Sequence, residues 1–251
     1  MADLALSVSN TIARLQLNRP AVLNALSPEL LSELIDLCAE LRSDDEIRVV
    51  LLEGVGEHFS AGADLPSFTR GLQSDPHHTA DLGRRASEAI STLPQITIAA
   101  IRGYCIGGGI VLSGACDMRV AADDTRFSIP ELAAGIPLSW GGMADLVRLL
   151  GPTVANDLVL TCKPFGAAEA LNAGFISRII PHGDFDKDID ALAGLVADRP
   201  AIVLRQTKRK LNDIRAGVFD ARDDAADMLD AAADEEAAAM GRAYVRERLG
   251  S

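Results

Sequence analysis

The chain has 251 residues and a formal net charge of −12. This length suits one large domain that buries its core without disulfide staples. The acidic balance argues against a nucleic-acid partner, which needs clustered Lys and Arg, and no stretch reaches the ~18 apolar residues of a membrane span.

The cysteines and the first residues of the chain indicate the cellular compartment in which the protein works. The four cysteines lie in apolar or helical contexts without metal-ligand spacing, which favours reduced thiols that pack as small hydrophobes. The first residues lack a basic region followed by a long apolar block. We therefore expect a cytoplasmic protein that binds no metal, nucleic acid or membrane.

The first half of the chain alternates predicted strands and helices. Residues 4–17 alternate apolar and polar side chains around Asn10, which predicts a β-hairpin. Ser27 before Pro28 is typical of a helix N-cap, and apolar residues then recur at helical spacing. Residues 47–54 and 96–103 read as buried strands, so the pattern indicates an α/β fold.

The second half continues the same pattern. Residues 117–122 and 125–129 are predicted strands, and residues 151–161 a helix. Residues 167–180 predict a helix that ends near Gly174 and leads into a strand. The last ~50 residues predict only helices.

We divide the chain into a catalytic core at residues 1–195 and a C-terminal helical region at residues 196–251. Residues 71–78, with the sequence GLQSDPHH, contain several turn-forming residues. They are predicted to form a mobile surface loop.

Two glycine-containing stretches carry the chemistry. FSAGAD at residues 59–64 and GYCIGGGIVL at 103–112 each predict a tight turn, and the second leads into a helix. The first N–H groups of a helix have no intrahelical acceptor and attract negative charge. If both turns face one point, two N–H donors would stabilise a developing oxyanion. A simple close-packing turn is the alternative, and neither nucleotide-binding spacing is present.

Three side chains near these stretches have two possible roles each. Glu131 follows Pro130 and is either a catalytic carboxylate or a first-turn residue that compensates a helix dipole. Asp64 is either a substrate contact or, preferably, a helix N-cap. Trp140, the only tryptophan, packs in the core or lines an acyl pocket.

As an ordered set, these segments resemble the crotonase family of enoyl-coenzyme A hydratases and isomerases. The segments that carry the resemblance are LNRPAVLNAL at 17–26, FSAGADL at 59–65, IRGYCIGGGIVLSGACDMRVAA at 101–122, FSIPELAAGIP at 127–137 and GFISRIIP at 174–181. The resemblance implies a spiral of ββα turns followed by a helical trimerisation region. The protein would then be a homotrimer or a dimer of trimers.

The resemblance also implies the site residues and the substrate. Ala63 and Gly108 would donate the two oxyanion N–H groups to the carbonyl of a coenzyme A thioester, and no other cofactor would be required. The candidate substrate contacts are Leu23, Ala25, Ala61, Ala63, Asp64, Leu65, Gly108, Val111 and Trp140.

The chain departs from the family pattern at one informative position. Hydratases of this family carry a second glutamate three residues past the oxyanion glycine, where this chain has Val111. Hydration divides proton transfer between two carboxylates, whereas moving a double bond needs one base. With Glu131 alone, the pattern resembles the 3,2-enoyl-coenzyme A isomerases of fatty-acid β-oxidation. Another reaction of the family, such as hydration, and a non-catalytic acyl-coenzyme A binding protein remain as alternatives.

Overall fold

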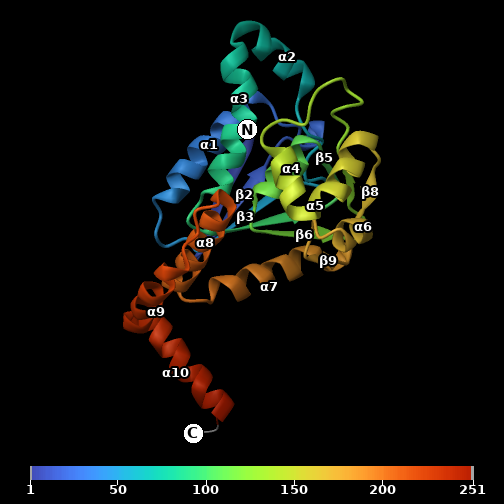
Figure 1. The fold of residues 1–251 in the computed structure, drawn as a ribbon. Helices are drawn as coiled ribbons and strands as arrows, with labels where there is room; N and C mark the ends of the chain where they lie inside the picture. Colours follow the sequence, from blue (N-terminus) through green and yellow to red (C-terminus); the bar gives the residue numbers. More distant parts are fainter. Residues whose placement is uncertain (1, 250–251) are drawn as a thin grey trace.

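The computed structural model describes residues 2–249, which form an α/β fold on a main sheet of six strands (Figure 1). In spatial order the strands are β1 (Leu4–Ser9), β2 (Ile12–Leu17), β3 (Val49–Gly54), β4 (Ile96–Ile101), β6 (Met118–Ala122) and β9 (Arg178–Ile180). β1 and β2 pair antiparallel, and all other neighbours in this sheet pair parallel. The predicted α/β class and strands are confirmed.

Ten α-helices are assigned within the described residues. They are α1 (Pro28–Arg42), α2 (Leu65–Ser74), α3 (Pro76–Ser91), α4 (Gly108–Ala115), α5 (Gly142–Thr161), α6 (Ala167–Asn172), α7 (Phe185–Ala197), α8 (Ala201–Ala216), α9 (Asp224–Ala233) and α10 (Glu235–Leu249). Short 3₁₀ turns occur at Pro20–Val22, His182–Asp184 and Ala221–Asp223. No helix among residues 2–249 is long and apolar enough to cross a membrane.

Local signals set several of these boundaries as predicted. Asn10 has a φ of 52° at the hairpin turn, a conformation that asparagine tolerates better than most residues. The Leu30 N–H donates to the Ser27 hydroxyl at 3.2 Å, so Ser27 caps α1.

The main sheet buries side chains on both faces. Leu52 and its neighbours on one face pack with α1, α3 and α4. Leu51 points the opposite way and packs in a second apolar cluster with Phe185 and Ile189 of α7. Because successive side chains of a strand point to opposite faces, a strand such as β3, which is buried over its whole length, packs on both sides.

The predicted loop at residues 71–78 is wrong. These residues are helical except at Asp75, which separates α2 from α3. Asp75 accepts a hydrogen bond from the His78 N–H at 3.2 Å, and Pro76 begins the helix. The turn-forming residues therefore serve as a cap between two helices, which single-sequence composition does not distinguish from a loop.

The helix predicted at residues 151–161 is the second half of α5, which begins at Gly142. Gly151 has a φ of 73° and ψ of 161°, so the helix axis breaks there before Pro152 starts the second half. The sequence pattern did not predict the first half, residues 142–150.

A second, smaller sheet brings the glycine-rich stretches together. It contains β5 (Tyr104–Ile106), β7 (Arg126–Ser128) and β8 (Phe165–Gly166). Isolated parallel bridges extend it, one joining Ser60 to Cys105 and one joining Leu26 to Ala63. The first bridge holds residues 59–64 beside the segment that enters α4, and the second joins them to residue 26.

The C-terminal helices leave the body of the molecule, and α10 lies farthest from the sheet in Figure 1. α8 remains attached through Lys208, whose ammonium lies 2.7 Å from both carboxylate oxygens of Asp117. Residues 201–249 are helical apart from short connections, as predicted.

Candidate active site

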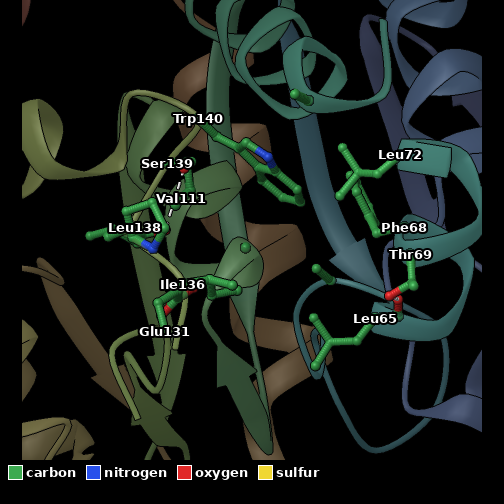
Figure 2. A pocket seen from close by; sticks show the side chains of 14 residues that line it. Leu65, Phe68, Thr69, Leu72, Val111, Glu131, Ile136, Leu138, Ser139 and Trp140 are labelled. Atoms are coloured by element: carbon green, nitrogen blue, oxygen red, sulfur yellow. Dashed lines mark hydrogen bonds between the residues drawn. The ribbon is translucent and has the colours of Figure 1, made fainter. Parts of the chain in front are cut away.

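An apolar cavity of about 280 Å³ lies between α2 and the segment of residues 131–140. Figure 2 shows Leu65, Phe68 and Leu72 on one wall and Glu131, Leu138 and Trp140 on the other. The complete lining is Ala63, Leu65, Phe68, Thr69, Leu72, Ala80, Gly108, Val111, Glu131, Ile136, Pro137, Leu138, Ser139 and Trp140.

Two backbone N–H groups at the cavity are free to bind an oxyanion. In the bridge to Leu26, the N–H of Leu26 donates to Gly62 O at 2.8 Å and that of Asp64 donates to Leu26 O at 2.9 Å. The intervening Ala63 N–H therefore points to the other side. Gly108 is the first residue of α4, and within residues 2–249 neither its N–H nor that of Ala63 has an acceptor.

The two donors belong to turns in close contact. A Cβ built on Gly62 would lie 3.5 Å from Gly108 N and 2.8 Å from Ile106 O. Gly62 also has a φ of 88°, so a side chain there would be both strained and crowded. The glycine at this position allows the 59–64 turn to approach the start of α4.

Gly107, the glycine before α4, accommodates Glu131. Gly107 has a φ of 50°, and a Cβ on it would lie 2.5 Å from Glu131 Oε1. The carboxylate thus rests directly on the backbone that leads into α4. This contact explains a glycine at 107 better than turn formation alone.

Glu131 lies in a turn at residues 131–135, and the next helix begins only at Gly142. Its interpretation as a first-turn helix residue is therefore wrong. Its Oε2 is buried and has no hydrogen-bond partner within the described chain. Burial raises the pKa of the Glu131 carboxyl, against a smaller lowering by its own backbone N–H.

Val111 lies one helical turn beyond Gly108 and lines the same cavity, as predicted. It is 3% exposed and packs against Gly142, where a Cβ would lie 2.5 Å from Val111 Cγ2. Among the described residues that line the cavity, Glu131 is the only one with a carboxylate, an amine or an imidazole. One base therefore serves the whole cavity.

Four predicted substrate contacts do not line this cavity: Leu23, Ala25, Ala61 and Asp64. Asp64 accepts from the Ser67 N–H at 3.1 Å and from Arg19 at 3.0 Å, so the N-cap interpretation is confirmed. Leu23 accepts from the Ala61 N–H at 2.9 Å and stays next to the 61–64 turn. Coenzyme A binding at these residues stays a prediction.

The cavity contains several residues that the sequence did not identify. On α2, Phe68, Thr69 and Leu72 join the predicted Leu65 at positions i, i+3, i+4 and i+7. This spacing marks one helix face and was available in the sequence. The residues at 136–139 form an irregular segment, which offers no such periodicity.

A raised-pKa carboxylate beside two free N–H donors in an apolar cavity is an arrangement suited to proton transfer next to a developing oxyanion. The sequence model of the family described as "Enoyl-CoA hydratase/isomerase" matches residues 7–249, so the chain belongs to this family.

Individual proteins agree with the family assignment. The "Probable enoyl-CoA hydratase echA8" of Mycobacterium tuberculosis is 34% identical over 196 residues, which cover 78% of this chain and 76% of that protein. The crystal structure of an enoyl-CoA hydratase from Bacillus anthracis has a TM-score of 0.81 at 31% identity, covering 84% of this chain and 83% of that one. A Thermobifida fusca YX protein, solved in complex with acetoacetyl-CoA, has a TM-score of 0.81 at 28% identity and covers 91% and 92%.

Proposed function

We propose that this enzyme is an acyl-coenzyme A double-bond isomerase, which converts a 3-enoyl thioester into the trans-2-enoyl isomer. The observation that carries the proposal is the single carboxylate of the cavity, Glu131, with Val111 in the place of a second acid. The acyl-coenzyme A substrate is supported by the family and by the acetoacetyl-CoA bound to the Thermobifida protein.

The first step removes a proton from C2 of the substrate. The Glu131 carboxylate takes the proton, the C2–H bond breaks, and its electron pair delocalises into the thioester to give a dienolate. The N–H groups of Ala63 and Gly108 would hold the resulting oxyanion. Each such donor contributes about 3 kcal/mol of transition-state stabilisation.

The second step returns the proton at C4. The protonated Glu131 donates to C4, a C4–H bond forms, and the double bond moves from C3=C4 to C2=C3. A base that also serves as the acid works best when its pKa lies near the working pH. Burial raises the pKa of Glu131 in that direction. Both steps use a carboxylate and two N–H donors, so the reaction calls for no metal or redox cofactor.

Hydration is the second candidate, because relatives of this chain carry hydratase names. Adding water to C3 requires a group that places and deprotonates the water while another acid protonates C2. The apolar side chain of Val111 offers no such group. We therefore expect any hydration to be slower than isomerisation.

The test supplies the purified enzyme with 3-enoyl- and 2-enoyl-coenzyme A in deuterated buffer and identifies the products by mass spectrometry. Isomerisation predicts a 2-enoyl product whose mass does not include an added water molecule. Deuterium should appear at C2 and C4 to the extent that the proton on Glu131 exchanges with the buffer. If crotonyl-coenzyme A is hydrated faster than any 3-enoyl substrate is isomerised, the proposal is wrong. Binding without turnover of either substrate would favour the non-catalytic alternative.

We also propose that the C-terminal helical region, which the structure describes over residues 196–249, is a trimerisation region. Large apolar side chains are exposed there, including Val218, Met228 and Leu229 at 68%, 74% and 73%. So many exposed apolar side chains in one region favour a partner surface. Sedimentation equilibrium would distinguish a trimer or a dimer of trimers from a monomer. The buried free thiols of Cys38, Cys105 and Cys116 support a cytoplasmic location.

A further inference from the structure

Trp140 lies across the cavity between two helices. A Cβ on Gly83 of α3 would lie 1.9 Å from Trp140 Cδ2, and a Cβ on Gly108 of α4 would lie 2.4 Å from Cζ3. The indole therefore rests directly on two backbones and reaches the glycine that would hold the thioester oxygen. Neither position accepts a side chain while the ring is in place.

The backbone and an aromatic neighbour hold the indole in this orientation. Trp140 has a φ of 61° and Gly141 a φ of 81°, so two consecutive left-handed residues turn the chain just before α5. The Phe68 ring of α2 lies 5.6 Å away, tilted by 35°. Figure 2 shows the Trp140 ring pointing toward Phe68 of α2. The tryptophan thus joins three helices at one end of the pocket.

Small residues of α3 make room for the ring. Ala80 lines the cavity, and Gly83 follows one helical turn later on the same face. If the indole were absent, the space along this face would be continuous with the cavity. The cavity volume of about 280 Å³ lies just below the roughly 300–1,000 Å³ typical of small-molecule pockets.

We propose that Trp140 is the specificity-determining residue that ends the acyl channel and selects short- and medium-chain acyl groups. This inference rests on the proposed acyl-thioester substrate. A linear acyl group that starts at Gly108 runs along the indole, and the Trp140–Phe68 ring contact, with centroids 5.6 Å apart, would block its path between α2 and α3. Each buried methylene strengthens binding about fourfold, so affinity should rise with chain length and then stop rising.

The wild-type protein carries its own probe, because Trp140 is its only tryptophan. Saturated acyl-coenzyme A esters from four to sixteen carbons bind without reacting, so their titration does not depend on isomerase activity. We expect tryptophan emission to change with each ester and to stay constant with coenzyme A alone. An affinity that rises evenly through sixteen carbons would refute the proposal.

Substitutions then move the end of the channel. In Trp140→Ala, measured by titration calorimetry, affinity should continue to rise for several further carbons, with at least a tenfold gain for the longest esters relative to the shortest. Ala80→Leu keeps the tryptophan and narrows the channel, so its affinity should stop rising at a shorter chain. Leu132→Ala, on the same segment but 40% exposed and outside the cavity, is the matched control and should behave as wild type.

The outcomes separate this inference from the proposed reaction. If Trp140→Ala and Ala80→Leu both retain the wild-type chain-length profile, Trp140 does not end the channel, whatever the enzyme catalyses. If Trp140→Ala fails to fold, Ala80→Leu decides by the same criterion. The chain-length profiles of both variants could shift as expected in an enzyme that does not isomerise 3-enoyl substrates. That result would refute the proposed reaction but support Trp140 as the end of the acyl channel.

Discussion

Two carboxylates of this protein, the buried one of Asp117 and the half-buried one of Glu131, have opposite surroundings. Asp117 accepts hydrogen bonds from Lys208 at 2.7 Å on both oxygens, and from the Thr97 N–H and hydroxyl at 2.8 and 3.0 Å. Glu131 has one buried oxygen with no partner among the described residues. Asp117 joins the C-terminal helix α8 to the core, whereas Glu131 faces an open cavity.

The comparison shows that the effect of burial on a carboxylate depends on its hydrogen-bond partners. The Asp117 carboxylate is engaged by a cation on both oxygens and by an N–H and an O–H donor on one of them, so it fixes α8 to the core. A buried carboxylate without donors is costly to ionise, and its pKa rises. In the proposed reaction, the missing partners of Glu131 are what would allow it to take up and release a proton.

The largest effect is expected from Glu131→Gln. The carboxamide keeps the shape but cannot accept a proton, so kcat for isomerisation should fall by about 10³-fold or more. Acyl-coenzyme A affinity should stay within a few-fold, and the free energy of unfolding should not decrease. Steady-state kinetics and urea denaturation measure these effects. Wild-type turnover in this variant would show that Glu131 is not the base.

Lys208→Met should have the opposite effect, lowering the stability of the protein and leaving kcat nearly unchanged. It leaves the Asp117 charge buried without its cation, at a cost of about 3–5 kcal/mol in the free energy of unfolding. The kcat of the folded fraction should stay within a few-fold of wild type. Arg205→Met is the control on α8, because its ion pair with Asp45 is exposed and contributes less than about 1 kcal/mol. Equal losses in the two variants would remove the distinction between the buried and the exposed pair.

Gly107→Ala tests the contact that positions Glu131. The new Cβ would meet Glu131 Oε1 at 2.5 Å, and φ is 50°, so the carboxylate must move. Because a displacement of about 1 Å at a reacting group costs roughly 10²-fold, we expect kcat to fall about 10- to 100-fold.

Gly114→Ala in α4 is the matched control for Gly107→Ala. No heavy atom outside the local helix backbone lies within 4 Å of the point that its new Cβ would occupy. A helical alanine is favoured over glycine by about 0.5–1 kcal/mol. The variant should be at least as stable as wild type and equally active. A similar loss of kcat in both variants would point to a general disturbance of α4.

The pH dependence follows from the direction of the Glu131 pKa. Only the ionised carboxylate removes the C2 proton, so kcat/KM should fall as the pH drops through a pKa above the ordinary value of about 4.3. A raised pKa favours the folded state at low pH, and this contribution is lost as the pH rises through the folded-state value. Glu131→Gln should therefore gain stability relative to wild type over that pH range. If kcat/KM instead falls on the acid side with an apparent pKa at or below the ordinary carboxyl value, Glu131 is not the base.

The smallest effect is expected from Val111→Glu, which adds the second acid. Detectable hydration of 2-enoyl-coenzyme A should appear, because two carboxylates would then be available to hold a water. Packing against Gly142 should cost about 1–3 kcal/mol of stability, and the added charge should raise the pKa of Glu131 further. Val111→Gln has similar size without a charge and should not hydrate. Equal hydration by the two variants would exclude the second carboxylate as its cause.

The turns and helix caps that could be predicted depend on residues close together in the sequence. The hairpin at Asn10 and the caps at Ser27 and Asp64 depend on residues within a few positions of one another, so they are readable from the sequence. The same short range explains the error at residues 71–78. There Asp75 and Pro76 cap a helix with the residue types that also form loops.

By itself, the sequence determined the order along the chain of the strands in the main sheet, the glycine turns, and the presence of Glu131 with Val111 in place of a second acid. Only the tertiary structure decided which groups meet. The Lys208–Asp117 pair joins positions 91 residues apart, and the contact of Trp140 with Gly83 and Gly108 joins three elements. Such contacts depend on how helices pack on the sheets, and no local pattern of residues encodes them. The unpartnered state of Glu131 likewise follows from the walls of the cavity around it.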